Sequence, residues 1–270
     1  MRNLLLFTIL LLFSYKSYCQ EEVFFKVQYL PEKIYIQSIV STSKSEINYL
    51  GPESLLEKIK EKNIENPNST FKKTYLKSKN KTGKLAENNF PITIEFIGGE
   101  NGIIPDDTVV FGKVIPGKTP TLDSISAPNM EADFKESFFK SMKNTMAQIE
   151  LPEKNVKIGE SFSREMPLKM PIGKYNLELK NTIVYALKKV ENNQAFFDIS
   201  QTYYIISTGI EMKAEGNGTG QIIYDIKNNF YLFYELKSTI NMEVQNDEMN
   251  FKGTIENTFT QNTTITTNNN

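Results

Sequence analysis

The chain has 270 residues and is almost neutral, with 31 Lys and Arg against 32 Asp and Glu and a formal net charge of −1. A chain with this balance has no electrostatic attraction to nucleic acid or to an anionic membrane surface, so we expect neither as a partner. It contains no histidine and a single cysteine, Cys19. The composition therefore excludes histidine-based catalytic triads and the usual imidazole metal sites.

Residues 1–19 have the pattern of a secretory signal peptide. Arg2 precedes an apolar run over residues 4–13, which is too short to cross a bilayer because a spanning helix needs about 20 residues. A basic start, a short apolar run and small residues before the cut are typical of an export signal. Ser17 and Cys19 are the small residues if cleavage follows Cys19.

The alternative is a lipoprotein signal in which Cys19 itself carries the lipid. Such sites prefer a small residue directly before the cysteine and Leu three residues before it, whereas Tyr18 and Lys16 stand here. We therefore favour cleavage, and expect residues 20–270 to be periplasmic or secreted to the cell surface. No later apolar run is long enough for a transmembrane helix, and the loss of Cys19 leaves no disulfide or thiol chemistry.

We expect residues 20–270 to form a single β-rich domain with an N-terminal part (20–128), a central helix (129–150) and a C-terminal meander (151–266). Apolar residues recur three or four apart in the central segment, which predicts a helix with one apolar face. These residues are Met130, Phe134, Phe138, Met142, Met146 and Ile149. One such helix in a β-rich chain must bury its apolar face against a sheet.

Before this helix the alternation of apolar and polar residues predicts strands, in part ended by proline and glycine. The strands are expected at residues 21–30, 33–49, 71–77, 91–97, 108–115 and 121–126. The first two are joined at Pro31-Glu32, and residues 77–84 are expected to be a basic turn. A capping-box pattern, Ser54 followed by Glu57, predicts an additional short helix.

After the helix the alternation is more regular. Strands are expected at residues 161–168, 175–190, 195–206, 221–226, 230–244 and 250–261. A glycine-rich break is expected at residues 216–220, and the polar end of the chain is expected to fray.

Short Asn, Asp and Gly turns between these strands predict hairpins and hence an antiparallel meander. Strands with one polar and one apolar face indicate a sheet that is wet on one side, and strands this long must twist. The sequence thus predicts a mainly β fold: a strongly curved antiparallel sheet (half-barrel) wrapped around one long helix, with one additional short helix. A flat β-sandwich is the alternative. An outer-membrane barrel is less favoured because a helix with an apolar face lies mid-chain.

Three segments resemble a family of secreted Bacteroidetes proteins of unknown function. They are LPEKNVKIGESFSREMPL (151–168), QAFFDISQTYYI (194–205) and GNGTGQIIYDIKNN (216–229). LLEKIK (55–60), FPITIEF (90–96) and LDSIS (122–126) fit the same pattern in order. The resemblance implies export and fold but no catalytic residues. A looser similarity of architecture connects such chains to periplasmic lipoprotein carriers, whose half-barrel holds acyl chains, although a shared fold does not fix function.

Two motifs that suggest chemistry have simpler interpretations. Asp106 and Asp107 are adjacent in a Pro/Gly loop, which is typical of a solvated turn. The glycines of residues 216–220 resemble a phosphate loop, but such a loop must open a helix, and a strand is expected next. We therefore predict no catalytic residue, no metal site and no cofactor, and a protein that is not an enzyme.

The apolar face of the helix is the remaining candidate site. Its Phe and Met side chains are expected to pack in the core, and the functional alternative is that they line a lipid-sized cavity under the sheet. The candidate residues are Phe134, Phe138, Met142 and Met146. Two functions follow: binding of a hydrophobic or acylated ligand, or an envelope structural or protein-interaction module with a fully packed core. The sequence leaves the oligomeric state open.

Overall fold

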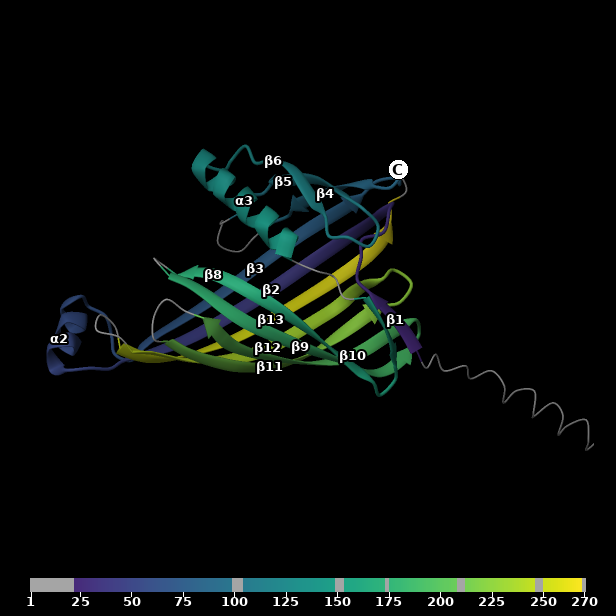
Figure 1. Cartoon of the computed structure of the whole chain (residues 1–270). Coiled ribbons are helices and arrows are strands. Elements are labelled where there is room, and N and C mark those ends of the chain that lie inside the picture. The colour runs from purple at the N-terminus through teal and green to yellow at the C-terminus, as the bar shows by residue number, and fades with distance from the viewer. Residues whose placement is uncertain are drawn as a thin grey trace, which may run out of the picture.

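The computed structural model describes residues 22–98, 104–148, 153–172, 175–207, 212–245 and 250–268. The expected export signal with Cys19 lies outside these residues, as do Ile149 and Pro152 near the end of the expected helix. Within the described residues the fold is mainly β, with one large antiparallel sheet and two helices (Figure 1). This part of the predicted fold class is confirmed.

The large sheet has eleven strands in the order β6-β5-β4-β3-β2-β13-β12-β11-β10-β9-β8. The strands are β2 (Lys33–Tyr49), β3 (Asn68–Thr82), β4 (Phe90–Phe96), β5 (Val109–Val114), β6 (Thr121–Ser126), β8 (Ser161–Ile172), β9 (Tyr175–Glu191), β10 (Gln194–Ser207), β11 (Met212–Asp225), β12 (Phe230–Gln245) and β13 (Asn250–Thr267). Strands β2–β6 form one meander and β8–β13 form a second.

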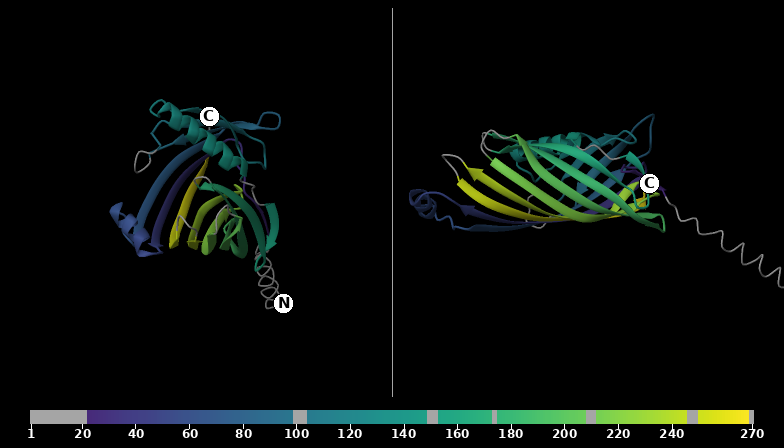
Figure 2. Two further views of the ribbon diagram at one scale, coloured as in Figure 1. Left: turned by 60° about the vertical axis from the view of Figure 1, so that its left-hand side comes forward. Right: turned by 60° about the horizontal axis from the view of Figure 1, so that its bottom comes forward.

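The two meanders are joined by the first and last strands of the large sheet. The β2–β13 register runs from Tyr49 opposite Phe251 to Lys33 opposite Thr267, along the whole of β2. Strands far apart in the sequence thus form the middle of the sheet, and β6 and β8 are its edges. The long strands twist along their length (Figure 2).

The long helix is present but is placed differently from the expectation. Helix α3 (Ala132–Gln148) packs on the short strands β4–β6 at one border of the sheet, as Figures 1 and 2 show. The described residues show no sheet wrapped around this helix. The expected short helix is α2 (Glu53–Glu61), which projects from one end of the sheet in Figure 1.

The first described strand does not form the expected hairpin with the second. β1 (Glu22–Lys26) pairs antiparallel with β7 (Glu153–Lys157) in a separate two-stranded sheet. Val23 and Phe25 are fully buried, whereas Phe24 between them is 46% exposed. Burying these two side chains among the aromatic residues of β8–β12 is the reason that β1 leaves β2.

Strands continue through three places where the sequence predicts a turn, a break or a frayed end. β3 continues through the expected basic turn to Thr82, because Ser78, Asn80 and Thr82 alternate as buried residues. β11 continues through the glycines at residues 216–220, which lie opposite Ile240, Ser238 and Leu236 of β12. β13 continues to Thr267 because β2 supplies a partner along its whole length.

Residues opposite one another in antiparallel strands share a face, and the register therefore defines two faces of the large sheet. The inner face carries β1 on the side of β9–β12 and α3 on the side of β4–β6. Tyr29 packs against the buried clusters of both sides and connects them. The opposite, outer face carries most of the polar side chains.

Candidate functional site

The inner face is filled with aromatic rings where β1 covers it. Phe25 contacts five rings, with centroid distances from 4.8 Å to Phe197 to 6.1 Å to Tyr231. The other three are Phe162, Tyr185 and Tyr224. Such tilted pairs stabilise a core beyond the area they bury. This region is packed core and leaves no space for a ligand around Phe25.

Several tyrosine hydroxyls in this region are held by hydrogen bonds. The Tyr35 hydroxyl accepts from the Leu30 amide at 2.8 Å, and the Tyr224 hydroxyl donates to the Lys26 carbonyl at 2.9 Å. The Tyr29 hydroxyl accepts from Asn80 Nδ2 at 3.1 Å. Burial raises the pKa of each of these three tyrosines to about 12 because it disfavours the charged phenolate.

A different surface lies on the same inner face beyond the two packed clusters. Seven apolar side chains of β2, β12 and β13 are half-buried there and belong to neither cluster. We call them the apolar strip: Ile47, Tyr49, Ile240, Met242, Phe251, Ile255 and Phe259. The register places them together, with Ile240 opposite Ile255 and Phe251 opposite Tyr49.

Charge is separated between the two faces of the long strands. Every charged side chain in residues 34–49 of β2, in β10, in residues 212–224 of β11, and in β12 and β13 lies on the outer face by register. These residues are Lys44, Glu46, Asp198, Lys213, Glu215, Glu235, Lys237, Glu243, Lys252 and Glu256. The half-buried apolar strip therefore has no charged neighbour on its own face within these strands. On the adjoining strand β3, Lys72 lies on this face, opposite Ser43.

One row of uncharged polar residues crosses the inner face between the rows that carry Ile255 and Phe259. In register, Gln201 lies opposite Gly218, Gly218 opposite Ser238, and Ser238 opposite Asn257. We call this row, with Asn181, the polar belt: Asn181, Gln201, Ser238 and Asn257. Gln201 Nε2 donates to Asn181 Oδ1 at 2.7 Å, but Gln201 Oε1 is buried and has no hydrogen-bond partner in the protein.

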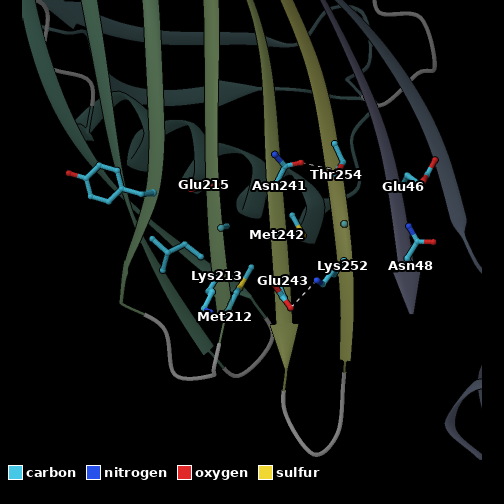
Figure 3. Close-up of a pocket in the computed structure, with 14 residues that line it drawn as sticks. Glu46, Asn48, Met212, Lys213, Glu215, Asn241, Met242, Glu243, Lys252 and Thr254 are labelled. Carbon is cyan, nitrogen blue, oxygen red and sulfur yellow. Dashed lines mark hydrogen bonds and ion pairs between the residues drawn. The ribbon is translucent and has the colours of Figure 1, made fainter. Parts of the chain in front are cut away.

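A pocket of about 620 Å³ lies on the outer face, where Figure 3 shows its lining residues. Glu243 and Lys252 pair across it at 3.4 Å, and Asn241 and Thr254 hydrogen bond at 3.1 Å. The pocket is open to solvent, and exposed ion pairs of this kind contribute little free energy. Two further pockets, of about 500 and 370 Å³, lie on the same face. This surface is a solvated polar face.

The four candidate residues of the helix lie along α3. Phe138, Met142 and Met146 are half-buried against the cluster of β4–β6, and the Phe138 and Phe96 rings meet edge-on at 5.9 Å. Phe134 is 42% exposed. None of the three pockets described above includes any of the four. A role in ligand binding therefore stays a prediction for these residues.

Sequence reasoning missed the apolar strip and the polar belt. The period-two alternation of β12 and β13 already places Ile240, Ser238 and Asn257 on apolar faces. The signal that was lacking is the register between β2, β10, β12 and β13, which joins these residues into one surface.

The described residues contain neither an acidic or thiol metal site nor a helix that could span a membrane. No group of three or more Asp, Glu or Cys side chains there could hold a metal ion. No helix within the same residues is long and apolar enough to cross a bilayer.

Comparisons with known proteins give no family. No family model and no curated protein matches the chain. Among solved structures, one match is an outer membrane channel from Pseudomonas putida F1, with a TM-score of 0.20 and 4% identity, covering 89% of this chain and 98% of that chain. A likeness this low carries no argument about fold or function, and the chain is therefore assigned to no family.

Proposed function

We propose that this protein is a non-catalytic exported protein that binds a hydrophobic or acylated molecule along the inner face of its sheet, with the long strands acting as a half-barrel. The observation that carries the proposal is the separation of charge between the faces. Solvent-exposed sheet surface normally carries polar and charged side chains, yet the side chains of the apolar strip are only half-buried, and β12 and β13 carry no charge on that face. Such a surface gains free energy when it is covered.

The dimensions of the strip favour a slender occupant. From Phe259 opposite Leu236 to Phe251 opposite Val244 it follows β13 for nine residues, which is roughly 30 Å of strand. On the same face the strip has β1 and its cluster on one side and α3 with its cluster on the other. An extended acyl chain matches this shape better than a folded protein does.

Helix α3 supplies an adaptable border to this surface. Its Phe and Met side chains can repack around different ligands, and Phe134 is already 42% exposed. In this proposal Phe134, Phe138, Met142 and Met146 contact the ligand when it binds.

The experiment is a titration with 1,6-diphenylhexatriene, an uncharged hydrocarbon whose fluorescence rises in apolar surroundings. We expect the protein to bind it and its melting temperature to rise, because a ligand that prefers the native state stabilises it. Ile240→Glu should abolish binding by placing a charge on the apolar strip, whereas Thr239→Glu, the neighbouring residue on the outer face, should leave it intact. Absence of binding to the folded wild-type protein would refute the proposal.

A second candidate function, an envelope protein-interaction module, is favoured by the end of the molecule that carries α2. No residue of this helix is buried, Leu50 is 36% exposed, and Phe71 is 69% exposed. Exposed apolar residues gathered at one end are typical of contact with a protein partner. Loss of partner capture by Phe71→Ser, together with no effect of Ile240→Glu, would favour this function over ligand binding.

A further inference from the structure

The polar belt is unusual because one of its buried members has an unused hydrogen-bond acceptor. Gln201 is 5% exposed, Asn181 is 3% exposed, and Ser238 is 9% exposed. Buried side-chain oxygens in proteins nearly always have a partner, and leaving one without a partner costs free energy. Gln201 Oε1 has none, although the amide nitrogen of the same side chain is engaged by Asn181.

The belt crosses the apolar strip, with Asn257 between Ile255 and Phe259 on β13. Gln201, Ser238 and Asn257 occupy one row across β10, β12 and β13. The next row toward the end of the sheet that carries Tyr49 contains Tyr203, Ile240 and Ile255, and Ser238 hydrogen bonds to Tyr203. A molecule whose chain covers Ile240 and Ile255 therefore brings its polar end next to the belt.

Gly218 places backbone without a side chain in the middle of this row. It lies between Gln201 and Ser238, and a Cβ there would approach the Lys237 carbonyl oxygen to 2.9 Å and Ser238 Cβ to 3.0 Å. A side chain at this position would collide with β12, so no side chain separates the two polar residues.

We propose that the polar belt recognises an uncharged hydrogen-bond donor, the hydroxyl or amide N–H of an acyl-chain amphiphile, through Gln201 Oε1. This inference rests on the proposed function and names its ligand class. The protein would thus select fatty alcohols and fatty amides over free fatty acids of the same length.

Discrimination against a carboxylate follows from desolvation. A carboxylate moved from water to an uncharged surface loses hydration that only a cation or several donors can replace. The inner faces of β10, β12 and β13 carry no charged residue in the described strands. Two cations lie on this row. Arg164 on the edge strand β8 is opposite Ile183, which is in turn opposite Gln201. Lys72 on β3 is opposite Ser43, which is in turn opposite Asn257, and it lies five strands away from Gln201. Arg164 is already engaged within the protein.

The test is displacement of bound diphenylhexatriene by dodecanol, dodecanamide and dodecanoate at about pH 7.5. We expect the alcohol and the amide to bind about tenfold or more tightly than the carboxylate. Gln201→Met should reduce affinity for the alcohol and the amide about tenfold relative to the affinity for diphenylhexatriene, because the hydrocarbon has no donor. The matched control is Gln221→Met, which changes the same side chain on the outer face of β11.

Gln201→Met leaves Asn181 Oδ1 without its donor, so a second variant guards against loss of folding. In Gln201→Met/Asn181→Leu both partners are replaced by apolar groups, which costs less than leaving one unpaired, and the same loss of selectivity is expected. Equal binding of the three amphiphiles, or equal effects of Gln201→Met and Gln221→Met, would overturn the inference while the proposed function stands. Preferred binding of dodecanoate that Arg164→Gln removes would also overturn it. Failure of diphenylhexatriene to bind at all would overturn both proposals.

Discussion

At the scale of single residues, Phe25 is the side chain on which the packed end of the inner face depends. It is fully buried and contacts rings from β8, β9, β10, β11 and β12. We expect Phe25→Ala to lower the free energy of unfolding by about 3–5 kcal/mol, because it leaves a cavity among these rings. Urea denaturation followed by circular dichroism measures this loss.

The neighbouring residue provides the control for that substitution. Phe24 is 46% exposed and points away from the cluster, so Phe24→Ala should cost less than about 1 kcal/mol. Similar losses for the two variants would show that β1 does not pack as described.

The buried tyrosines give the protein a defined limit of stability at high pH. The pKa of Tyr29, of Tyr35 and of Tyr224 is raised by burial from 10.0 to about 12. The folded protein holds these protons more tightly than the unfolded chain, so their stabilisation is complete below about pH 10 and is lost as the pH rises to about 12. We expect cooperative unfolding in this window. Absorbance of tyrosinate, recorded with circular dichroism, should show these tyrosines ionising together with unfolding.

At the scale of elements, the glycines of β11 allow close approach to β12. A Cβ on Gly220 would overlap the Glu235 carbonyl oxygen and lie 2.9 Å from Leu236 Cα. Backbone atoms cannot move aside cheaply, so we expect Gly220→Ala to destabilise the protein by about 2–3 kcal/mol. Thr219→Ala, on the outer face of the same strand, should cost less than about 1 kcal/mol. Thermal melts of the two variants make the comparison, and tolerance of Gly220→Ala would contradict the close packing of β11 on β12.

The elements also show what the sequence can and cannot predict. Alternation alone located β6, β9 and β12 almost to the residue, and the three-to-four spacing of apolar residues located α3. The strand predicted to pair with β1 was wrong, and the strands on which α3 packs were not predicted. In both cases the element has an apolar face that any sheet surface could cover. The glycines at residues 216–220 alternate with Asn217 and Thr219, a strand pattern hidden by the low strand propensity of glycine.

The candidate site shows the same limit. The Phe and Met face of α3 was visible in the sequence, but its packing on β4–β6 depends on where the chain returns after β6. The apolar strip and the polar belt combine residues from β2, β10, β12 and β13. Local periodicity assigns each residue to a face, whereas only the long-range register brings these residues together.

At the scale of the whole molecule, the β2–β13 pairing unites two meanders into one sheet. Because every strand between the edges is paired on both sides, a break at this seam separates the two halves of the large sheet. Thr258 lies at the middle of the seam, opposite Thr42 of β2 and Lys237 of β12. Proline there removes a backbone donor from a central strand, a position where proline is essentially not found.

We therefore expect Thr258→Pro to abolish the single cooperative unfolding transition. If a single transition remains, the urea concentration at its midpoint should fall by several tenths of the wild-type midpoint. The matched control is Lys169→Pro in the edge strand β8, which already contains Pro167 and Pro171 two residues away on either side. An edge strand tolerates proline where its N–H faces solvent, so this variant should unfold close to the wild type. The chain has no tryptophan, so tyrosine fluorescence and circular dichroism follow the transition in urea. A Thr258→Pro protein with the wild-type midpoint would mean that the two meanders fold independently and that the seam does not unite them.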